Sequence, residues 1–66
     1  MSNFRRKLDN AANSHARYDI DLAYDGSFTG TVERCGEEGY FLVTDDGKIY
    51  FEAEDVINMM LHRKYN

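Results

Sequence analysis

Apolar residues recur at every second position from Tyr18 onward, and this spacing restricts the possible fold more than any other feature of the chain. An alternation of apolar with polar or small residues is typical of a β-strand that buries one face. The apolar positions of the first such run are Tyr18, Ile20, Leu22 and Tyr24. Glycine-containing turns then separate further short strands, and they fall at residues 25–26, 36–39 and 45–47. The spacing therefore predicts antiparallel strands joined by tight turns.

The second run has a glycine among its apolar positions, because Phe28, Gly30 and Val32 share one face. A glycine inside a strand marks a sharp bend or the close approach of another backbone. We therefore expect the second strand to bend or to meet another strand closely at Gly30. Two short strands rich in apolar residues follow, at residues 40–44 and 49–51.

The residues before the strands have helical periodicity instead. In a stretch without glycine or proline, the apolar positions are Met1, Phe4, Leu8, Ala11 and Ala12. This spacing predicts an amphipathic helix from residue 3 to about residue 14. We assign residues 1–16 to this N-terminal helical segment and residues 18–60 to the strands of the same domain.

The C-terminal segment fits two different structures. Apolar residues at Val56, Met59 and Met60, with acidic residues before them and basic residues after them, suit a helix. The alternative is a single 3₁₀ turn at residues 54–55, followed by a fifth strand through residues 57–60. Helix propensity favours the first structure, whereas the need to cover an open sheet edge favours the second. The sequence alone leaves both possibilities open.

The 66 residues are expected to form one domain, and a domain of this size buries only about 60% of the surface that its unfolded chain exposes. Such domains usually need a disulfide, a metal or a partner subunit. Cys35 is the only cysteine, so no internal disulfide can form, and a lone thiol favours the cytoplasm. We expect neither a metal nor a cofactor. Self-association into a homo-oligomer is the expected source of additional stability.

The net charge of -4 conceals a separation of charges along the chain. One group of basic residues lies near the N-terminus and consists of Arg5, Arg6, Lys7 and Arg17. A second is the basic tail at residues 61–66, and the residues between the two groups carry nearly all of the carboxylates. Because an acidic body repels phosphate, nucleic acid is expected to bind only at the basic ends. No run of about 18 apolar residues is present, so we expect no membrane span.

Three side chains have the chemistry for nucleophilic catalysis or metal binding, namely Cys35, His15 and His62. The acidic neighbours of Cys35 disfavour a reactive thiolate, and no pair of these residues has the spacing of a zinc site. Residues 45–47 resemble the centre of a calcium loop, but Leu42 stands where the first carboxylate ligand is required. A domain this small also leaves little room for a substrate cleft of about 300 Å³. We therefore expect a binding protein and not an enzyme.

A helix followed by strongly bent strands, with a one-turn 3₁₀ step before the last strand, resembles the Sm-like family of small β-barrels. The residues that carry the resemblance are 20–26, 28–32, 40–43, 49–51 and 54–57, within residues 18–60. They are similar to the Sm pattern of a strand ending in a glycine turn, a strand with a central glycine, an apolar strand and a closing strand. The resemblance implies a five-stranded antiparallel barrel of the SH3/Sm-like type behind the N-terminal helix.

Within this family the chain resembles the Hfq-type bacterial RNA chaperones, which also begin with a helix and form rings. These chaperones hold RNA phosphate at the pore with a Lys-His pair, whereas the matching stretch here, residues 51–55, is acidic. We therefore expect no RNA binding at a pore. They also carry an arginine patch on the helix rim, to which residues 5–7 are similar. The resemblance implies contact with RNA or a nucleotide through Arg5, Arg6, Lys7 and Arg17.

A second hypothesis is a small acidic module that docks on a basic surface of a partner protein, in the manner of a phage-type inhibitor or adaptor. The overall charge favours this hypothesis, whereas the fold resemblance favours nucleic acid. Exposed aromatic side chains can stack on bases or form a protein interface, and methionine side chains suit adaptable contacts with a partner. The candidate interface residues are Tyr40, Tyr50, Met59, Met60, Glu37 and Glu38.

Overall fold

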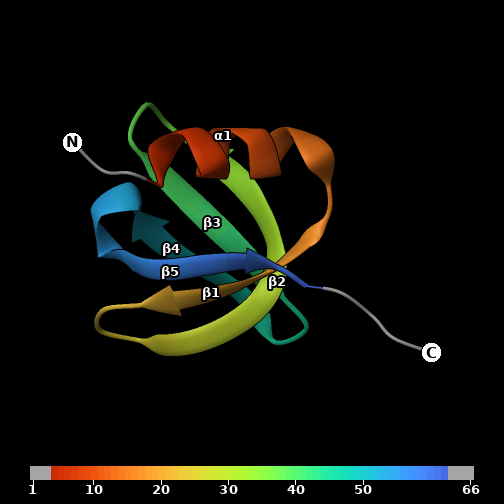
Figure 1. The fold of residues 1–66 in the computed structure, drawn as a ribbon, viewed down its shortest axis with the longest axis vertical. Helices are drawn as coiled ribbons and strands as arrows, with labels where there is room; N and C mark the ends of the chain where they lie inside the picture. The colour runs from red at the N-terminus through yellow and green to blue at the C-terminus, as the bar shows by residue number, and fades with distance from the viewer. Residues whose placement is uncertain (1–3, 63–66) are drawn as a thin grey trace.

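The computed structural model describes residues 4–62, which form one α-helix and a five-stranded sheet (Figure 1). The elements in chain order are α1 (Arg5–Ser14), β1 (Arg17–Leu22), β2 (Gly26–Cys35), β3 (Gly39–Thr44), β4 (Gly47–Glu52), the 3₁₀ turn η1 (Ala53–Asp55) and β5 (Val56–Leu61). The chain is therefore mainly β with an N-terminal helix, as the sequence predicts.

The strands form a single antiparallel sheet in the order β4-β3-β2-β1-β5. The long strand β2 joins the two halves of this sheet, because residues 26–31 pair with β1 and residues 31–35 pair with β3. Figure 1 shows β2 curving, so that β1 and β5 lie in front of β3 and β4. Within residues 4–62, β4 and β5 are the edges of the sheet and do not pair with each other. The sheet is thus strongly bent but open, and strand pairing does not close it into a barrel.

The change of partner along β2 occurs next to Gly30. Gly30 is buried and pairs with Tyr18 of β1, and the following residue, Thr31, pairs with Val43 of β3. A β-carbon on Gly30 would collide with the backbone carbonyl of Val43. Only a glycine allows β3 to come this close. The predicted close approach of another backbone is therefore confirmed.

The core lies between α1 and the concave face of the bent sheet, where α1 covers one end (Figure 1). The helix contributes Leu8 and Ala11, both fully buried. The buried apolar residues of the other elements are Ile20, Leu22, Val32, Tyr40, Leu42, Phe51, Ala53, Val56 and Met59. The aromatic rings of Tyr40 and Phe51 stack with their centroids 5.7 Å apart. The two faces of the sheet therefore follow the predicted alternation.

The helix ends where the sequence predicts, whereas the first strand is shorter than predicted. The helix ends at Ser14, because His15 adopts a left-handed backbone conformation with a φ of 58°. The first strand ends at Leu22, so Tyr24 lies in the β1–β2 turn and is 89% exposed, although the alternation placed it on the buried face of the strand. The Ala23 N–H donates to the carbonyl oxygen of Asp55 at 2.8 Å, after which the chain turns toward β2. Met1, predicted on the apolar side of the helix, lies outside the described residues.

The C-terminal segment is a strand, and the helical alternative is wrong. The preceding turn η1 is held by the Glu52 N–H, which donates to the carboxylate of Asp55 at 3.0 Å. The strand β5 then pairs with β1. Hydrogen bonds to an existing strand outweigh local helix propensity, which takes no account of tertiary contacts. Residues 63–66 of the predicted basic tail lie outside the described residues. No helix within residues 4–62 has the length and apolar composition to cross a membrane.

Candidate binding surfaces

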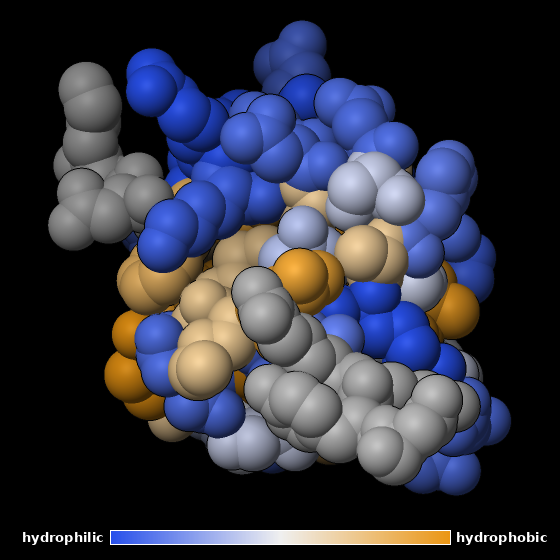
Figure 2. All heavy atoms as spheres, turned by 45° about the vertical axis from the view of Figure 1, so that its right-hand side comes forward, coloured by the Kyte–Doolittle hydropathy of each residue, from blue (hydrophilic) through white to orange (hydrophobic). Residues whose placement is uncertain are grey.

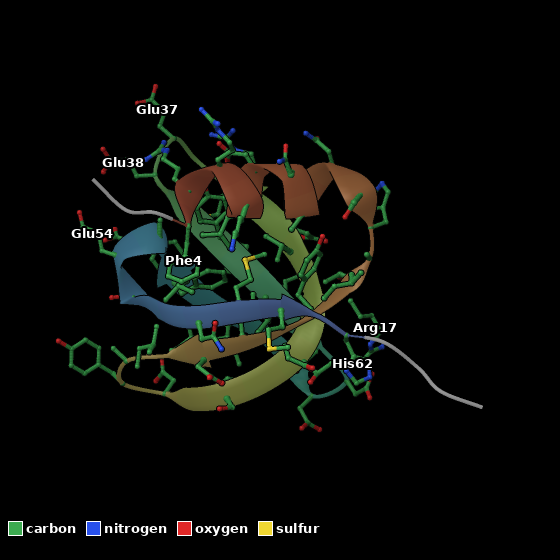
Figure 3. All side chains as sticks on the ribbon, in the orientation of Figure 1. Phe4, Arg17, Glu37, Glu38, Glu54 and His62 are labelled. Atoms are coloured by element: carbon green, nitrogen blue, oxygen red, sulfur yellow. The ribbon has the colours of Figure 1, made fainter. Side chains whose placement is uncertain are left out.

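The start of α1 is tied to the β2–β3 turn by the side chain of Arg5. Nη2 of Arg5 donates to the carbonyl oxygen of Glu37 at 2.6 Å, and Nη2 of Arg34 reaches the same oxygen at 3.5 Å. The side chains of Glu37 and Glu38 extend outward from this turn, beside the start of the helix (Figure 3). The predicted basic residues of α1 and the predicted acidic interface residues are therefore neighbours at one end of the molecule.

Tyr40 belongs to the core, so its prediction as an interface residue is wrong. Only 1% of the residue is exposed. Its hydroxyl donates to Oδ1 of Asp9 at 2.7 Å, and Nη1 of Arg34 lies 3.4 Å from the same oxygen. Burial, followed by the hydrogen bond to Asp9, raises the pKa of Tyr40. The buried hydroxyl is thus satisfied at the junction between β3 and α1.

The predicted nucleic-acid-binding residues do not form one surface. Arg6 and Lys7 are exposed on α1, where Nζ of Lys7 lies 5.7 Å from the centre of the Phe4 ring. Arg17 lies beyond the other end of the helix, which has 10 residues and is therefore about 15 Å long (Figure 3). There the Arg17 guanidinium is 4.0 Å from the carboxylate of Asp45. Arg17 is consequently separate from the basic residues at the start of α1.

The two open edges of the sheet carry exposed apolar side chains. On β5 the exposed fractions of Ile57, Met60 and Leu61 are 63%, 62% and 48%. On β4, Tyr50 is 51% exposed, whereas Met59, also predicted at an interface, is buried in the core. Figure 2 shows apolar surface below the hydrophilic side chains of α1, next to the end of β5. An open edge strand with apolar side chains is a site for pairing with another chain.

Tyr50 is held in position by its neighbours on β3 and β4. Its ring lies so close to Gly39 that a β-carbon there would collide with it. It also meets the Phe41 ring edge-on, with centroids 5.9 Å apart, and its hydroxyl lies 3.4 Å from Oε2 of Glu52. Partial burial, followed by the negative charge of Glu52, raises the pKa of Tyr50. The ring therefore lies in a fixed position over β3, while half of the residue remains exposed.

A cluster of three polar side chains, those of Asp19, Thr29 and His62, joins β1, β2 and the end of β5. Oδ1 of Asp19 accepts a hydrogen bond from the Thr29 hydroxyl at 2.5 Å and lies 3.0 Å from Nδ1 of His62. A hydroxyl activated for nucleophilic attack must contact the imidazole, whereas here the carboxylate stands between the two. The group therefore fits a role in fastening the end of β5 to β1. The hydrogen bond from Thr29, followed by that from His62, lowers the pKa of Asp19.

This lowered pKa makes a prediction about acid stability. A carboxyl group whose pKa is lower in the folded than in the unfolded chain stabilises the fold above its unfolded pKa, 3.8 for Asp19, and loses this contribution as the pH falls through the folded value. Asp19→Asn should therefore lower the urea midpoint at neutral pH, and the difference from the wild type should shrink in acid. Asp25→Asn is the control, because the Asp25 carboxylate makes no hydrogen bond or ion pair within residues 4–62. A difference that stays constant with pH would contradict the prediction.

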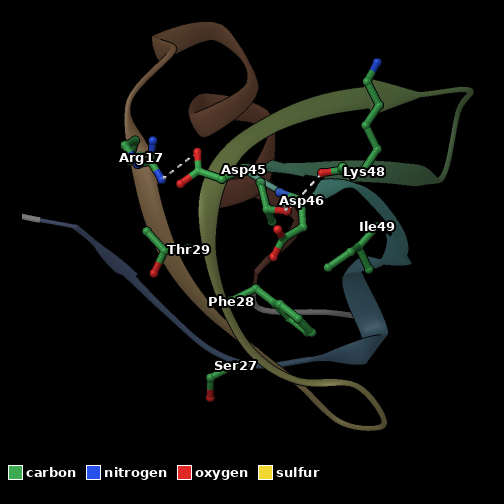
Figure 4. A pocket seen from close by; sticks show the side chains of 10 residues that line it. Arg17, Ser27, Phe28, Thr29, Asp45, Asp46, Lys48 and Ile49 are labelled. Carbon is green, nitrogen blue, oxygen red and sulfur yellow. Dashed lines mark hydrogen bonds and ion pairs between the residues drawn. The ribbon is translucent and has the colours of Figure 1, made fainter.

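A pocket of about 380 Å³ lies between β2 and the β3–β4 turn. Its apolar walls are Phe28 and Ile49, both half-buried, and Asp45 and Asp46 also line it (Figure 4). The sequence did not predict this pocket, and its volume exceeds the room expected in so small a domain. From the sequence, Phe28 and Ile49 could be predicted only as core residues of their strands. The bend of β2 brings the two side chains together, and their outer surfaces then form a wall of the pocket.

The remaining candidates in the part of the chain that the structure describes are metal-binding groups and the thiol. That part holds no group of three or more histidine, cysteine or acidic side chains that could bind a metal ion. Cys35 is a half-buried free thiol at the end of β2. The expectation of a non-catalytic protein stays a prediction.

No protein-family model matches the chain, and no curated protein matches it either. The resemblance to the Sm-like family therefore stays an interpretation of the sequence pattern.

Proposed function

We propose that the protein is a non-catalytic binding module of the Sm-like type, which assembles with copies of itself through the two open edges of its sheet. The observation that carries this proposal is the strand order β4-β3-β2-β1-β5, which leaves β4 and β5 unpaired on their outer sides within residues 4–62. An edge strand presents a row of N–H and C=O groups that readily pairs with another strand. Pairing of β4 in one copy with β5 in the next continues the sheet from chain to chain.

The chemistry of β5 supports such pairing. The His62 N–H donates to the carbonyl oxygen of Arg17 at 2.9 Å, so the backbone of residue 62 faces β1. Because backbone groups of an antiparallel strand alternate in direction, those of Leu61 and Met59 face the open edge. The exposed side chains of Ile57 and Met60 add apolar area there. A domain this small gains much of its missing stability when such an edge is covered by a partner.

A contact between two different edges is heterologous, and it closes into a ring when the rotation between neighbours allows. The native mass, measured by light scattering behind a sizing column, tests this assembly. The expected result is a single species at several times the chain mass of 7.7 kDa. Its mass should change little with salt, because backbone pairing and apolar contacts are weakly screened.

The second part of the proposal is that the assembled module contacts RNA or a nucleotide through Arg6 and Lys7 on α1. Both side chains are exposed, and the nearby carboxylate of Asp9 is engaged by Tyr40 and Arg34. An assembly repeats this basic pair once per copy, so that individually weak phosphate contacts act together. Arg5 holds the carbonyl group of the β2–β3 turn and serves the attachment of the helix instead.

The combined substitution Arg6→Ala and Lys7→Ala should weaken binding of a fluorescently labelled RNA oligonucleotide by about tenfold or more at low salt, because two phosphate contacts are lost. The matched control is Arg17→Ala with Lys48→Ala, which removes the same charge away from the start of α1. This control should bind RNA nearly as well as the wild type. Equal losses in the two variants would show that only net charge matters and would contradict a site on α1.

A second candidate function is docking of the acidic body on a basic surface of a partner protein. It is favoured by one specific observation, the pocket between β2 and the β3–β4 turn, which is lined by two aspartates and a phenylalanine.

A further inference from the structure

We propose that the pocket between β2 and the β3–β4 turn binds an arginine side chain of a partner protein. This site is separate from the proposed self-assembly and from the basic residues of α1. An arginine needs an apolar wall for its methylene groups, an aromatic face for its guanidinium and a carboxylate to accept its hydrogen bonds. The pocket contains all three.

The apolar wall is formed by Phe28 of β2 and Ile49 of β4, which pack against the core from the outside. Both are anchored by strand pairing, Phe28 with Ile20 and Ile49 with Leu42. The volume of about 380 Å³ is near the lower limit of ordinary ligand pockets, which begin at about 300 Å³. The space therefore suits one long side chain better than a larger ligand.

The carboxylate is supplied by Asp46, in a turn whose shape is fixed by hydrogen bonds. The Asp46 N–H donates to the Thr44 hydroxyl at 3.1 Å, and this hydroxyl donates to the Gly47 carbonyl oxygen at 3.0 Å. Within residues 4–62 the Asp46 carboxylate itself makes no hydrogen bond or ion pair. In Figure 4 it points toward the space beside the Phe28 ring. A guanidinium in that space meets both the carboxylate and the ring.

The two basic residues that line the pocket do not turn it into an anion site. Nζ of Lys48 lies 3.1 Å from Glu33 and 5.6 Å from the centre of the Phe41 ring, and it points away from the pocket in Figure 4. The guanidinium of Arg17 is opposed by Asp45 at 4.0 Å. The charge left facing the pocket is therefore the negative charge of Asp46. This charge attracts a guanidinium and repels a phosphate.

The probe for this site is the peptide acetyl-Gly-Arg-Gly-amide, titrated into ¹⁵N-labelled protein and followed by backbone NMR shifts. The expected shifts concentrate at Phe28, Asp46 and Ile49. Asp46→Asn should weaken binding by about fivefold or more, because the guanidinium loses its charged acceptor. Asp25→Asn removes the same charge from the β1–β2 turn and should change the affinity by less than about twofold. A peptide with citrulline in place of arginine keeps the shape without the charge and should not bind.

Equal effects of the two asparagine substitutions, or equal binding of the citrulline peptide, would overturn the proposal. The same holds if uridine monophosphate shifts these resonances more strongly than the peptide does. The titration is repeated with Ile57→Lys, whose substitution lies on the β5 edge, away from the pocket. Retained peptide binding by this variant supports a site that is independent of assembly, and lost binding would overturn that independence and the proposal with it.

Discussion

Gly30→Ala is expected to destabilise the fold by about 3 kcal/mol, because the added methyl group would collide with the backbone carbonyl of Val43. The obstacle is backbone, so it cannot rotate away as the end of a side chain would. Relief requires β3 to move away from β2, although the two strands are hydrogen-bonded from Thr31 to Cys35. The stability of a small domain lies near the lower end of about 5–15 kcal/mol, so this loss should bring the chain close to unfolding.

Gly36→Ala is the matched control for this steric effect. Gly36 lies in the β2–β3 turn with a φ of 73°, and a β-carbon there meets nothing within 4 Å. Its cost is therefore the conformational one alone, about 1 kcal/mol. Urea unfolding of the two variants gives the comparison. If Gly30→Ala costs no more than Gly36→Ala, β3 does not press on Gly30 and the described packing is wrong.

Gly30 also illustrates what the sequence could predict. A glycine at an apolar position of a period-two run is a local signal, and its physical cause, a neighbouring backbone, follows from the missing side chain. The strands themselves could be predicted for the same reason, because alternation depends only on residues two apart. What the local pattern could not supply was the identity of the backbone that approaches, which is Val43 of β3.

Tyr40 was predicted at an interface but lies in the core, and the reason for this error lies in β3 itself. Both faces of β3 are apolar, since Tyr40 and Leu42 share one face while Phe41 and Val43 share the other. Alternation alone cannot decide which of these faces is buried. In the structure the face that carries Tyr40 is buried, and there Asp9 of α1 accepts a hydrogen bond from the tyrosine hydroxyl. That acceptor is 31 residues away in the chain, and no local pattern contains it.

The candidate sites were harder to predict than the strands, because they depend on how distant segments meet. The sequence grouped Arg17 with the basic residues of the helix. In the structure the length of α1 separates Arg17 from those residues, and its guanidinium lies near Asp45 instead. The pocket needs Phe28 and Asp46 from different halves of the bent sheet. The order of residues along the chain therefore showed where the charges lie in the sequence, but it did not show which residues contact them in the folded protein.

Ile57→Lys is expected to dissociate the assembly, raising its dissociation constant by roughly 30-fold, which corresponds to about 2 kcal/mol. Ile57 is 63% exposed on the edge strand β5, and a lysine on an edge strand opposes pairing because its charge must lose water. Tyr24→Lys is the matched control, since Tyr24 is an exposed apolar residue in the β1–β2 turn and the change of charge is the same. Light scattering over a dilution series gives the masses, and circular dichroism shows whether each variant is folded.

The partner edge is identified by Tyr50→Lys on β4. If β5 of one copy pairs with β4 of the next, each contact needs both edges, so Tyr50→Lys should dissociate the assembly about as well as Ile57→Lys does. If two β5 edges pair with each other, the product is a dimer and Tyr50→Lys leaves its mass unchanged. A wild-type mass of 7.7 kDa at every concentration would contradict both arrangements. The same mass loss in Tyr24→Lys would mean that added charge, and not the edge, controls association. Only dissociation by both edge substitutions, with the Tyr24 variant still assembled, supports a sheet that continues from chain to chain.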